Sequence, residues 1–143
     1  MARVLAIDYG TARTGLALSD PLGVTCRPLE ILREKDRRRL LARIEDVVRR
    51  EAVAEIVVGL PRPLAGGSNE QLRRVEQFAQ ELAESASVPV KTWDERFTSK
   101  LARAGMAESR PRGGRARGEA VDAVAACYLL QGYLDSRQPG STG

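Results

Sequence analysis

Three acidic residues occupy positions where a carboxylate needs a partner. Asp8 and Glu95 each end a run of residues that predicts a buried or half-buried strand. Asp122 lies in helical spacing with Ala125 and Ala126, which places it on or beside the apolar face of a predicted helix. An ionised carboxylate in such surroundings is costly unless it is paired with a cation or holds a metal.

Parallel pairing of the strands that end in Asp8 and Glu95 would bring these two acids together. The carboxyl ends of parallel strands meet at one edge of an open sheet, where ligands gather. Three converging carboxylates repel one another and raise each other's pKa values, and a divalent cation removes that conflict. Hard oxygen ligands that leave positions for water suit Mg2+ or Mn2+. The pattern therefore predicts a metal site formed by Asp8, Glu95 and Asp122.

Each acid also has a simpler explanation. Asp8 would accept hydrogen bonds from the backbone of the turn that follows it at Gly10. Glu95 would form a surface ion pair with Arg96. Asp122 would stabilise the start of a helix through a favourable interaction with the helix dipole. The three positions together favour the metal site more strongly than any one of them does.

The composition excludes several kinds of site. The 143 residues contain no histidine, which excludes histidine metal ligands, Ser-His-Asp triads and histidine general bases. Cys26 and Cys127 lie far apart in the sequence and have no zinc-like spacing, so we expect small buried thiols in a reduced protein. The net charge of +4 permits a polyanionic partner.

The order of predicted elements indicates an α/β fold with a mixed five-stranded sheet and helices packed on it. An opening hairpin gives antiparallel pairing, and the later alternation of strands and helices gives parallel pairing with right-handed crossovers. We expect one domain over residues 1–137, a mobile basic loop over 108–118, a disordered tail over 138–143, and a capping box formed by Ser68 and Gln71. The predicted strands cover 3–8, 15–19, 29–32, 55–61 and 88–95, and the predicted helices include 40–48, 72–86, 98–107 and 119–135.

Five segments that follow one another along nearly the whole chain form a recognisable set: Ile7–Gly10 with Arg13–Gly15, Val57–Pro61, Phe78–Leu82, Asp94–Ser99, and Asp122–Leu134. In this order they resemble the motifs of the YqgF/RuvX family. Two small departures are Phe97, where the family more usually has leucine, and Ser99, where it more usually has threonine.

The resemblance implies an RNase H-like fold and a nuclease activity. The family is described as maturing the 5′ end of 16S ribosomal RNA in ribosome biogenesis, and also as resolving Holliday junctions in DNA recombination. Its acidic motif positions fall on Asp8, Glu95 and Asp122. Our hypothesis is hydrolysis of phosphodiester bonds with two metal ions about 3.5–4 Å apart, one activating water and the other stabilising the leaving oxygen.

Basic residues near these acids are candidates for binding nucleic acid. Few aromatic side chains accompany them, so recognition of shape and backbone is more consistent with the sequence than recognition of bases. The candidates are Arg13, Arg96, Lys100, Arg110, Arg112, Arg115 and Arg117.

Other functions stay open at this point. A junction resolvase would act as a symmetric dimer, and the sequence does not decide between monomer and homodimer. A factor for ribosome assembly that binds RNA without cutting it would keep the basic residues. Asp8–Thr11 also resembles the phosphate loop of actin-like and sugar kinases, which need two such domains. We see neither a signal peptide nor a membrane span, and expect a cytoplasmic location.

Overall fold

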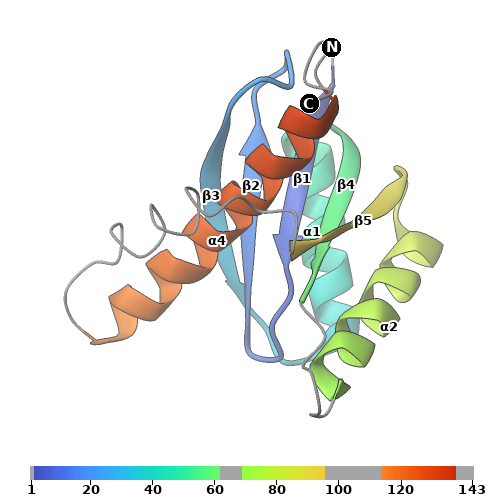
Figure 1. Ribbon diagram of the computed structural model, residues 1–143. Coiled ribbons are helices and arrows are strands. Elements are labelled where there is room, and N and C mark those ends of the chain that lie inside the picture. The colour runs from blue at the N-terminus through green and yellow to red at the C-terminus, as the bar shows by residue number, and fades with distance from the viewer. Residues whose placement is uncertain (1, 62–68, 96–113, 138–143) are drawn as a thin grey trace.

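A mixed five-stranded sheet forms the centre of the molecule (Figure 1). The computed structural model describes residues 2–61, 69–95 and 114–137, with side chains of the last segment from Ala123 onward. The strand order is β3-β2-β1-β4-β5; β1 pairs antiparallel with β2 and parallel with β4. This confirms the predicted sheet. The strands are β1 (Arg3–Asp8), β2 (Arg13–Ser19), β3 (Cys26–Arg33), β4 (Val53–Leu60) and β5 (Val90–Asp94).

Three described helices cover the two faces of this sheet: α1 (Arg37–Arg50), α2 (Glu70–Ser85) and α4 (Gly114–Arg137). Figure 1 shows α4 crossing one face and α1 lying behind the sheet. The side chain of Asp36 caps α1 by accepting a 3.1 Å hydrogen bond from the backbone N–H of Arg39. None of the described helices is long and apolar enough to cross a membrane.

The alternation of side chains along the strands divides the core in two. Leu5, Ile7 and Ile56 pack on the α1 and α2 side, where Phe78 is fully buried. On the α4 side the strand residues are smaller, and α4 supplies the leucines. Burying one leucine side chain there stabilises the folded protein by about 2 kcal/mol. The buried members of this side are Val4, Ala6, Ala17, Val57, Ala126, Leu129, Leu130, Tyr133 and Leu134.

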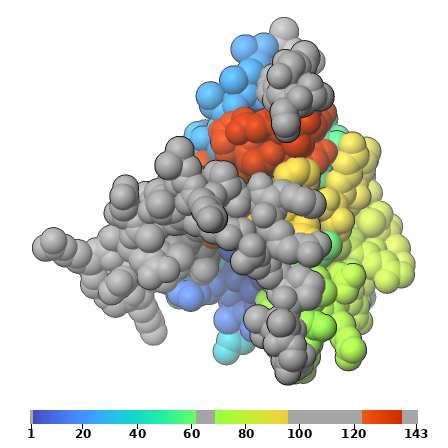
Figure 2. Space-filling model, in the orientation of Figure 1, coloured from blue at the N-terminus to red at the C-terminus, as the bar shows by residue number. Residues whose placement is uncertain are grey.

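Glu55 of β4 fixes the C-terminal half of α4 on the sheet. Its carboxylate accepts a 3.0 Å hydrogen bond from the Tyr133 hydroxyl and pairs with Arg137 at 2.6 Å. Lys91 of β5 pairs with it at 2.8 Å. Burial raises the pKa of the Glu55 carboxyl, but the hydrogen bonds from Lys91 and Tyr133 and the charge of Arg137 lower it more. Figure 2 shows α4 and β5 side by side on this face.

Replacing Glu55 by Gln is expected to destabilise the protein by roughly 1 kcal/mol at pH 7. A carboxyl whose pKa is lowered on folding stabilises the protein above its unfolded pKa of about 4.3, and this contribution is lost as the pH falls through the folded pKa. The difference in free energy of unfolding between wild-type protein and Glu55→Gln should therefore shrink toward zero on going from pH 7 to pH 3. Urea unfolding across this range measures it, and a constant difference would contradict the expectation.

Several predicted boundaries are wrong. The loop predicted over 108–118 overlaps α4, which begins at Gly114. Ala116 and its neighbouring arginines favour helix, and extending a helix whose other end is packed costs little, so Gly118 does not stop it. The N-cap of α2 is Asn69 and not Ser68. The predicted helix over 98–107 and the tail over 138–143 lie outside the described residues.

The outer strands differ from the predicted ones in length. β3 begins at Cys26, three residues before the predicted start, and includes Pro28. Proline is tolerated there because β3 is an edge strand and needs no N–H on its outer side. β5 ends at Asp94, so Glu95 directly follows the strand instead of ending it.

Candidate active site

The carboxyl ends of three parallel strands meet at one edge of the sheet. β4 pairs parallel with both β1 and β5, and Ile7 lies opposite Val58. Asp8 is the last residue of β1, and Glu95 is the first residue after β5. The structure therefore places these two acids on neighbouring parts of the same edge, as the expected parallel pairing requires.

Both acids belong to the face of the sheet that α4 covers. Ala6 lies in the core under α4, and Asp8 follows it by two residues, so the pleat directs its side chain to the same face. A Cβ atom built on Gly59 would lie 3.4 Å from the carboxylate atom Oε1 of Glu95. Gly59 follows Val57, another residue of that core, by two positions. The carboxylate of Glu95 thus lies over the backbone of β4 at Gly59, on the face of the sheet that α4 covers.

Helix α4 reaches this edge through a close contact with Gly59. The same Cβ atom would lie 2.7 Å from Cδ2 of Leu129, which is closer than carbon atoms approach without displacement. A side chain at this position would therefore push the helix or Leu129 away. Asp122 lies on α4 one turn before the buried Ala126. The structure describes the helix at Asp122 but not its side chain.

A tight turn after Asp8 holds the end of β1. The Thr14 hydroxyl donates to the carbonyl of Gly10 at 3.3 Å and accepts from its N–H at 3.4 Å. A Cβ atom on Gly10 would collide with the carbonyl oxygen of Arg13, so this position requires glycine. On the opposite face, the Tyr9 ring stacks on Phe78 with ring centroids 4.2 Å apart. The turn and the contact between Tyr9 and Phe78 therefore fix the backbone at Asp8, and with it the direction of the Asp8 side chain.

The structure brings together only part of the predicted site. Arg13 begins β2 beside the turn, and Arg115 and Arg117 belong to α4 without described side chains. Within the described side chains, no group of three or more His, Cys, Asp or Glu is arranged to hold a metal. The complete set of three acids therefore stays a prediction. Arg96, Lys100, Arg110 and Arg112 lie outside the described residues.

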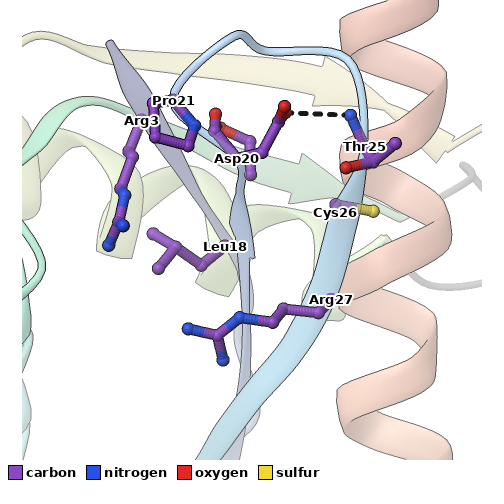
Figure 3. A pocket seen from close by; sticks show the side chains of 8 residues that line it. Arg3, Leu18, Asp20, Pro21, Thr25, Cys26 and Arg27 are labelled. Atoms are coloured by element: carbon purple, nitrogen blue, oxygen red, sulfur yellow. Dashed lines mark hydrogen bonds between the residues drawn. The ribbon is translucent and has the colours of Figure 1, made fainter.

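A pocket of about 240 Å³ opens at the far end of β1, beside Arg3 (Figure 3). Asp20 lines it and accepts a 3.0 Å hydrogen bond from the backbone N–H of Thr25. This bond and a second one from Val24 hold the pKa of Asp20 below its ordinary value. Because Arg3 and Asp8 are opposite ends of one strand, this pocket is separate from the edge that carries the acids.

Two features of the structure were missed by reasoning from the sequence. Gly59 was assigned to a strand and loop and given no role at the site, although a glycine inside a buried strand is a signal of close approach. Cys26 and Cys127 were expected to be small buried thiols far apart in the sequence, yet both are half-buried and their Sγ atoms lie 2.9 Å apart. No local pattern in the sequence connects residues so far apart.

Comparison with known proteins identifies the family of this chain. A family model described as "RuvX: Holliday junction resolvase" matches residues 2–136. The chain belongs to the RuvX family. The relatives of this RuvX chain include a protein of Koribacter versatilis that is 43% identical over 135 residues, 94% of this chain and 88% of the relative. A protein of Moorella thermoacetica is 41% identical over 133 residues, 93% and 94% of the two chains. Both carry the name "Putative pre-16S rRNA nuclease".

Solved structures show that this RuvX chain has the RNase H-like fold of RuvC-type resolvases. RuvC of Thermus thermophilus in complex with a Holliday junction superposes with a TM-score of 0.57 at 19% identity, covering 96% of this chain and 97% of that chain. The fowlpox virus resolvase in complex with junction DNA gives a TM-score of 0.57 at 10% identity, covering 96% and 99%. At these identities the likeness concerns the fold, and it confirms the predicted fold class.

Proposed function

We propose that this chain is a metal-dependent nuclease that hydrolyses phosphodiester bonds and matures the 5′ end of pre-16S rRNA in ribosome biogenesis. The observation that carries the proposal is the position of the Glu95 carboxylate over Gly59, on the same edge and face of the sheet as Asp8. We assign Asp8, Glu95 and Asp122 as catalytic residues and metal ligands, within one nuclease domain over residues 1–137.

The residues at this edge fit a divalent cation. Asp8 and Glu95 offer carboxylate oxygens, the donors that Mg2+ and Mn2+ prefer, and no histidine exists in the chain to bind a softer metal. Bound ions of this kind supply Lewis acidity toward water and the scissile phosphate. Asp8 at the end of β1 and Glu95 after β5 would hold them, and Asp122 would complete the set from α4. Gly59 has no Cβ atom, so Leu129 of α4 can pack closely on β4 beside the Glu95 carboxylate.

Basic residues would bind the phosphodiester backbone around this edge. Arg13 starts β2 directly after the turn that follows Asp8, so it lies beside the acids. A polyanionic RNA also suits the net charge of +4. We propose nucleic-acid binding by Arg13, Arg96, Lys100, Arg110, Arg112, Arg115 and Arg117.

RNA is the preferred substrate because the relatives named for pre-16S rRNA match at 41–43% identity over nearly their whole length. A cytoplasmic location follows from that substrate. The second candidate is resolution of Holliday junctions, which the description of the family favours. That activity would require a homodimer, because two strands must be cut symmetrically. A third candidate is RNA binding without cleavage, which would need the basic residues but not the three acids.

Cleavage of two labelled substrates separates these candidates. A precursor of the 16S 5′ end and a four-way DNA junction are each incubated with Mg2+, with Mn2+ and with excess EDTA. We expect the RNA to be cut at least about 10³-fold faster with metal than with EDTA, because the proposed reaction needs the metal to activate water and to stabilise the leaving oxygen. Paired symmetric nicks in the junction would favour the resolvase. Binding of RNA without cleavage under any condition would favour the assembly factor.

A further inference from the structure

The fold brings the two cysteines of the chain into contact. Cys26 is the first residue of β3, and Cys127 lies in α4, 101 residues further along the chain. Their Sγ atoms are 2.9 Å apart, closer than two sulfur atoms approach in ordinary van der Waals contact. Both are free thiols in this structure. The pair lies on the α4 face of the sheet, packed against the core.

Packing and hydrogen bonds hold the two thiols toward each other. Cys26 also lies within 3.1 Å of the carbonyl oxygen of Cys127 and 3.7 Å of Oε1 of Gln131. Gln131 is itself fixed, because its amide donates to the carbonyl of Val24 at 3.1 Å and to Asp135 at 2.8 Å. Figure 3 shows the sulfur of Cys26 pointing toward α4. The contact is therefore built by β3, α4 and the hairpin before β3 together.

The two thiols differ in acidity. The hydrogen bond from Cys26 lowers the pKa of Cys127, because it stabilises the thiolate at Cys127. The same bond, followed by burial, raises the pKa of Cys26. Cys127 is thus the first of the two to ionise, and a thiolate is the form of cysteine that reacts with peroxides and disulfides.

A pocket gives small oxidants access to the pair. Both cysteines are half-buried and line a hollow of about 290 Å³ formed by β3 and α4. Pro28, Tyr128 and Gln131 line it with them. A molecule of the size of hydrogen peroxide can therefore reach Cys127 without unfolding of the helix.

We propose that Cys26 and Cys127 are a redox site, which hydrogen peroxide converts to an intramolecular disulfide between β3 and α4. The Cys127 thiolate attacks one oxygen of the peroxide, the O–O bond breaks, and sulfenic acid and hydroxide form. The hydroxide takes up the proton that Cys127 released on ionising and becomes the first water. The Cys26 sulfur then attacks the sulfenic sulfur, the S–O bond breaks, and the leaving hydroxide takes the Cys26 thiol proton and departs as the second water. Two thiols and one peroxide give one disulfide and two waters, so two electrons pass from sulfur to oxygen.

The consequence is a covalent restraint on the helix that carries Asp122. The disulfide would close a loop of 101 residues, and a cross-link over such a loop removes much of the freedom of the unfolded chain. A low-molecular-weight thiol would reverse the reaction, as expected for a disulfide in a reducing compartment. This inference does not depend on the nuclease activity, because it follows from the two thiols alone.

Mass spectrometry and thermal unfolding of the full chain test the proposal. After treatment with a slight excess of hydrogen peroxide, we expect the monomer to lose two hydrogens, about 2 Da, and a peptide linking Cys26 to Cys127 to appear after digestion. The unfolding temperature should rise by roughly 5–15 °C, and dithiothreitol should reverse both changes. The peptide map needs no variant, so a failure of variants to fold would not affect it.

The matched controls are Cys26→Ser and Cys127→Ser, each of which keeps the size of the side chain and removes one thiol. Neither should gain stability on treatment, and Cys26→Ser should accumulate sulfenic acid at Cys127. Three results would overturn the proposal: a disulfide-linked dimer in place of the cross-linked monomer, addition of oxygen to both cysteines without a linked peptide, or an unchanged wild-type protein.

Discussion

Replacing Asp8 by Asn is expected to lower phosphodiester cleavage by at least about 10³-fold while leaving nucleic-acid binding nearly unchanged. Asparagine has the shape of aspartate, and the turn after Asp8 is held by Gly10 and Thr14, so the strand end should stay in place. What is lost is the negative charge that would hold a cation between Asp8 and Glu95. Normal turnover by Asp8→Asn would remove Asp8 from the site.

A second readout separates the loss of metal binding from a loss of fold. A ligand that binds the folded state at 100 times its Kd stabilises it by about 2.7 kcal/mol. Mg2+ or Mn2+ should therefore raise the unfolding temperature of wild-type protein, and this rise should be absent from Asp8→Asn and from Glu95→Gln. With EDTA, both variants should still unfold cooperatively, which shows that the fold is retained when the metal-induced stabilisation is lost.

The matched control for these variants is Asp46→Asn. Asp46 is an exposed acid on α1, the helix that packs on the opposite face of the sheet from α4. It loses the same charge by the same substitution, and both its cleavage rate and its metal-induced stabilisation should equal those of wild-type protein. An equal loss in Asp46→Asn would show that net charge, rather than the edge of the sheet, controls the reaction.

The sequence predicts the features of the site that follow from the direction of the strands. β1 covers the predicted residues 3–8, because an apolar run followed by Asp-Tyr-Gly has one consistent interpretation. Once the strands ending near Asp8 and Glu95 are parallel, their acids must share an edge. Asp122 was placed on the last helix by its spacing from Ala126, and α4 does bury Ala126 completely.

The features that the sequence does not predict are contacts across the α4 face. The start of α4 was missed because its first turns are rich in arginine and glycine and have no apolar stripe; the stripe begins near Ala126. The contact between Cys26 and Cys127 depends on α4 passing over β3, which no short-range pattern encodes. The role of Gly59 likewise depends on where Leu129 meets the sheet.

Gly59→Ala is expected to lower cleavage by about 10²-fold, the loss that a displacement of about 1 Å at a reacting centre can cause. The new methyl group would lie 2.7 Å from Cδ2 and 3.2 Å from Cδ1 of Leu129, whereas its 3.4 Å distance to Oε1 of Glu95 is close to ordinary contact. The main effect is therefore a displacement of the buried Leu129, and we expect it to move α4, and with it Asp122, away from the edge of the sheet. Overpacking of this kind also destabilises by about 1–3 kcal/mol.

The double variant Gly59→Ala/Leu129→Val distinguishes a shift of the helix from an effect on Glu95. Valine lacks both Cδ atoms, so the added methyl group no longer meets the helix, while its distance to Glu95 is unchanged. If displacement of α4 causes the loss, the double variant should recover most of the cleavage rate and stability, and Leu129→Val alone should lose only about 1 kcal/mol. If the double variant stays as inactive as Gly59→Ala, the methyl group acts on the Glu95 carboxylate, and the position of α4 is not what limits cleavage.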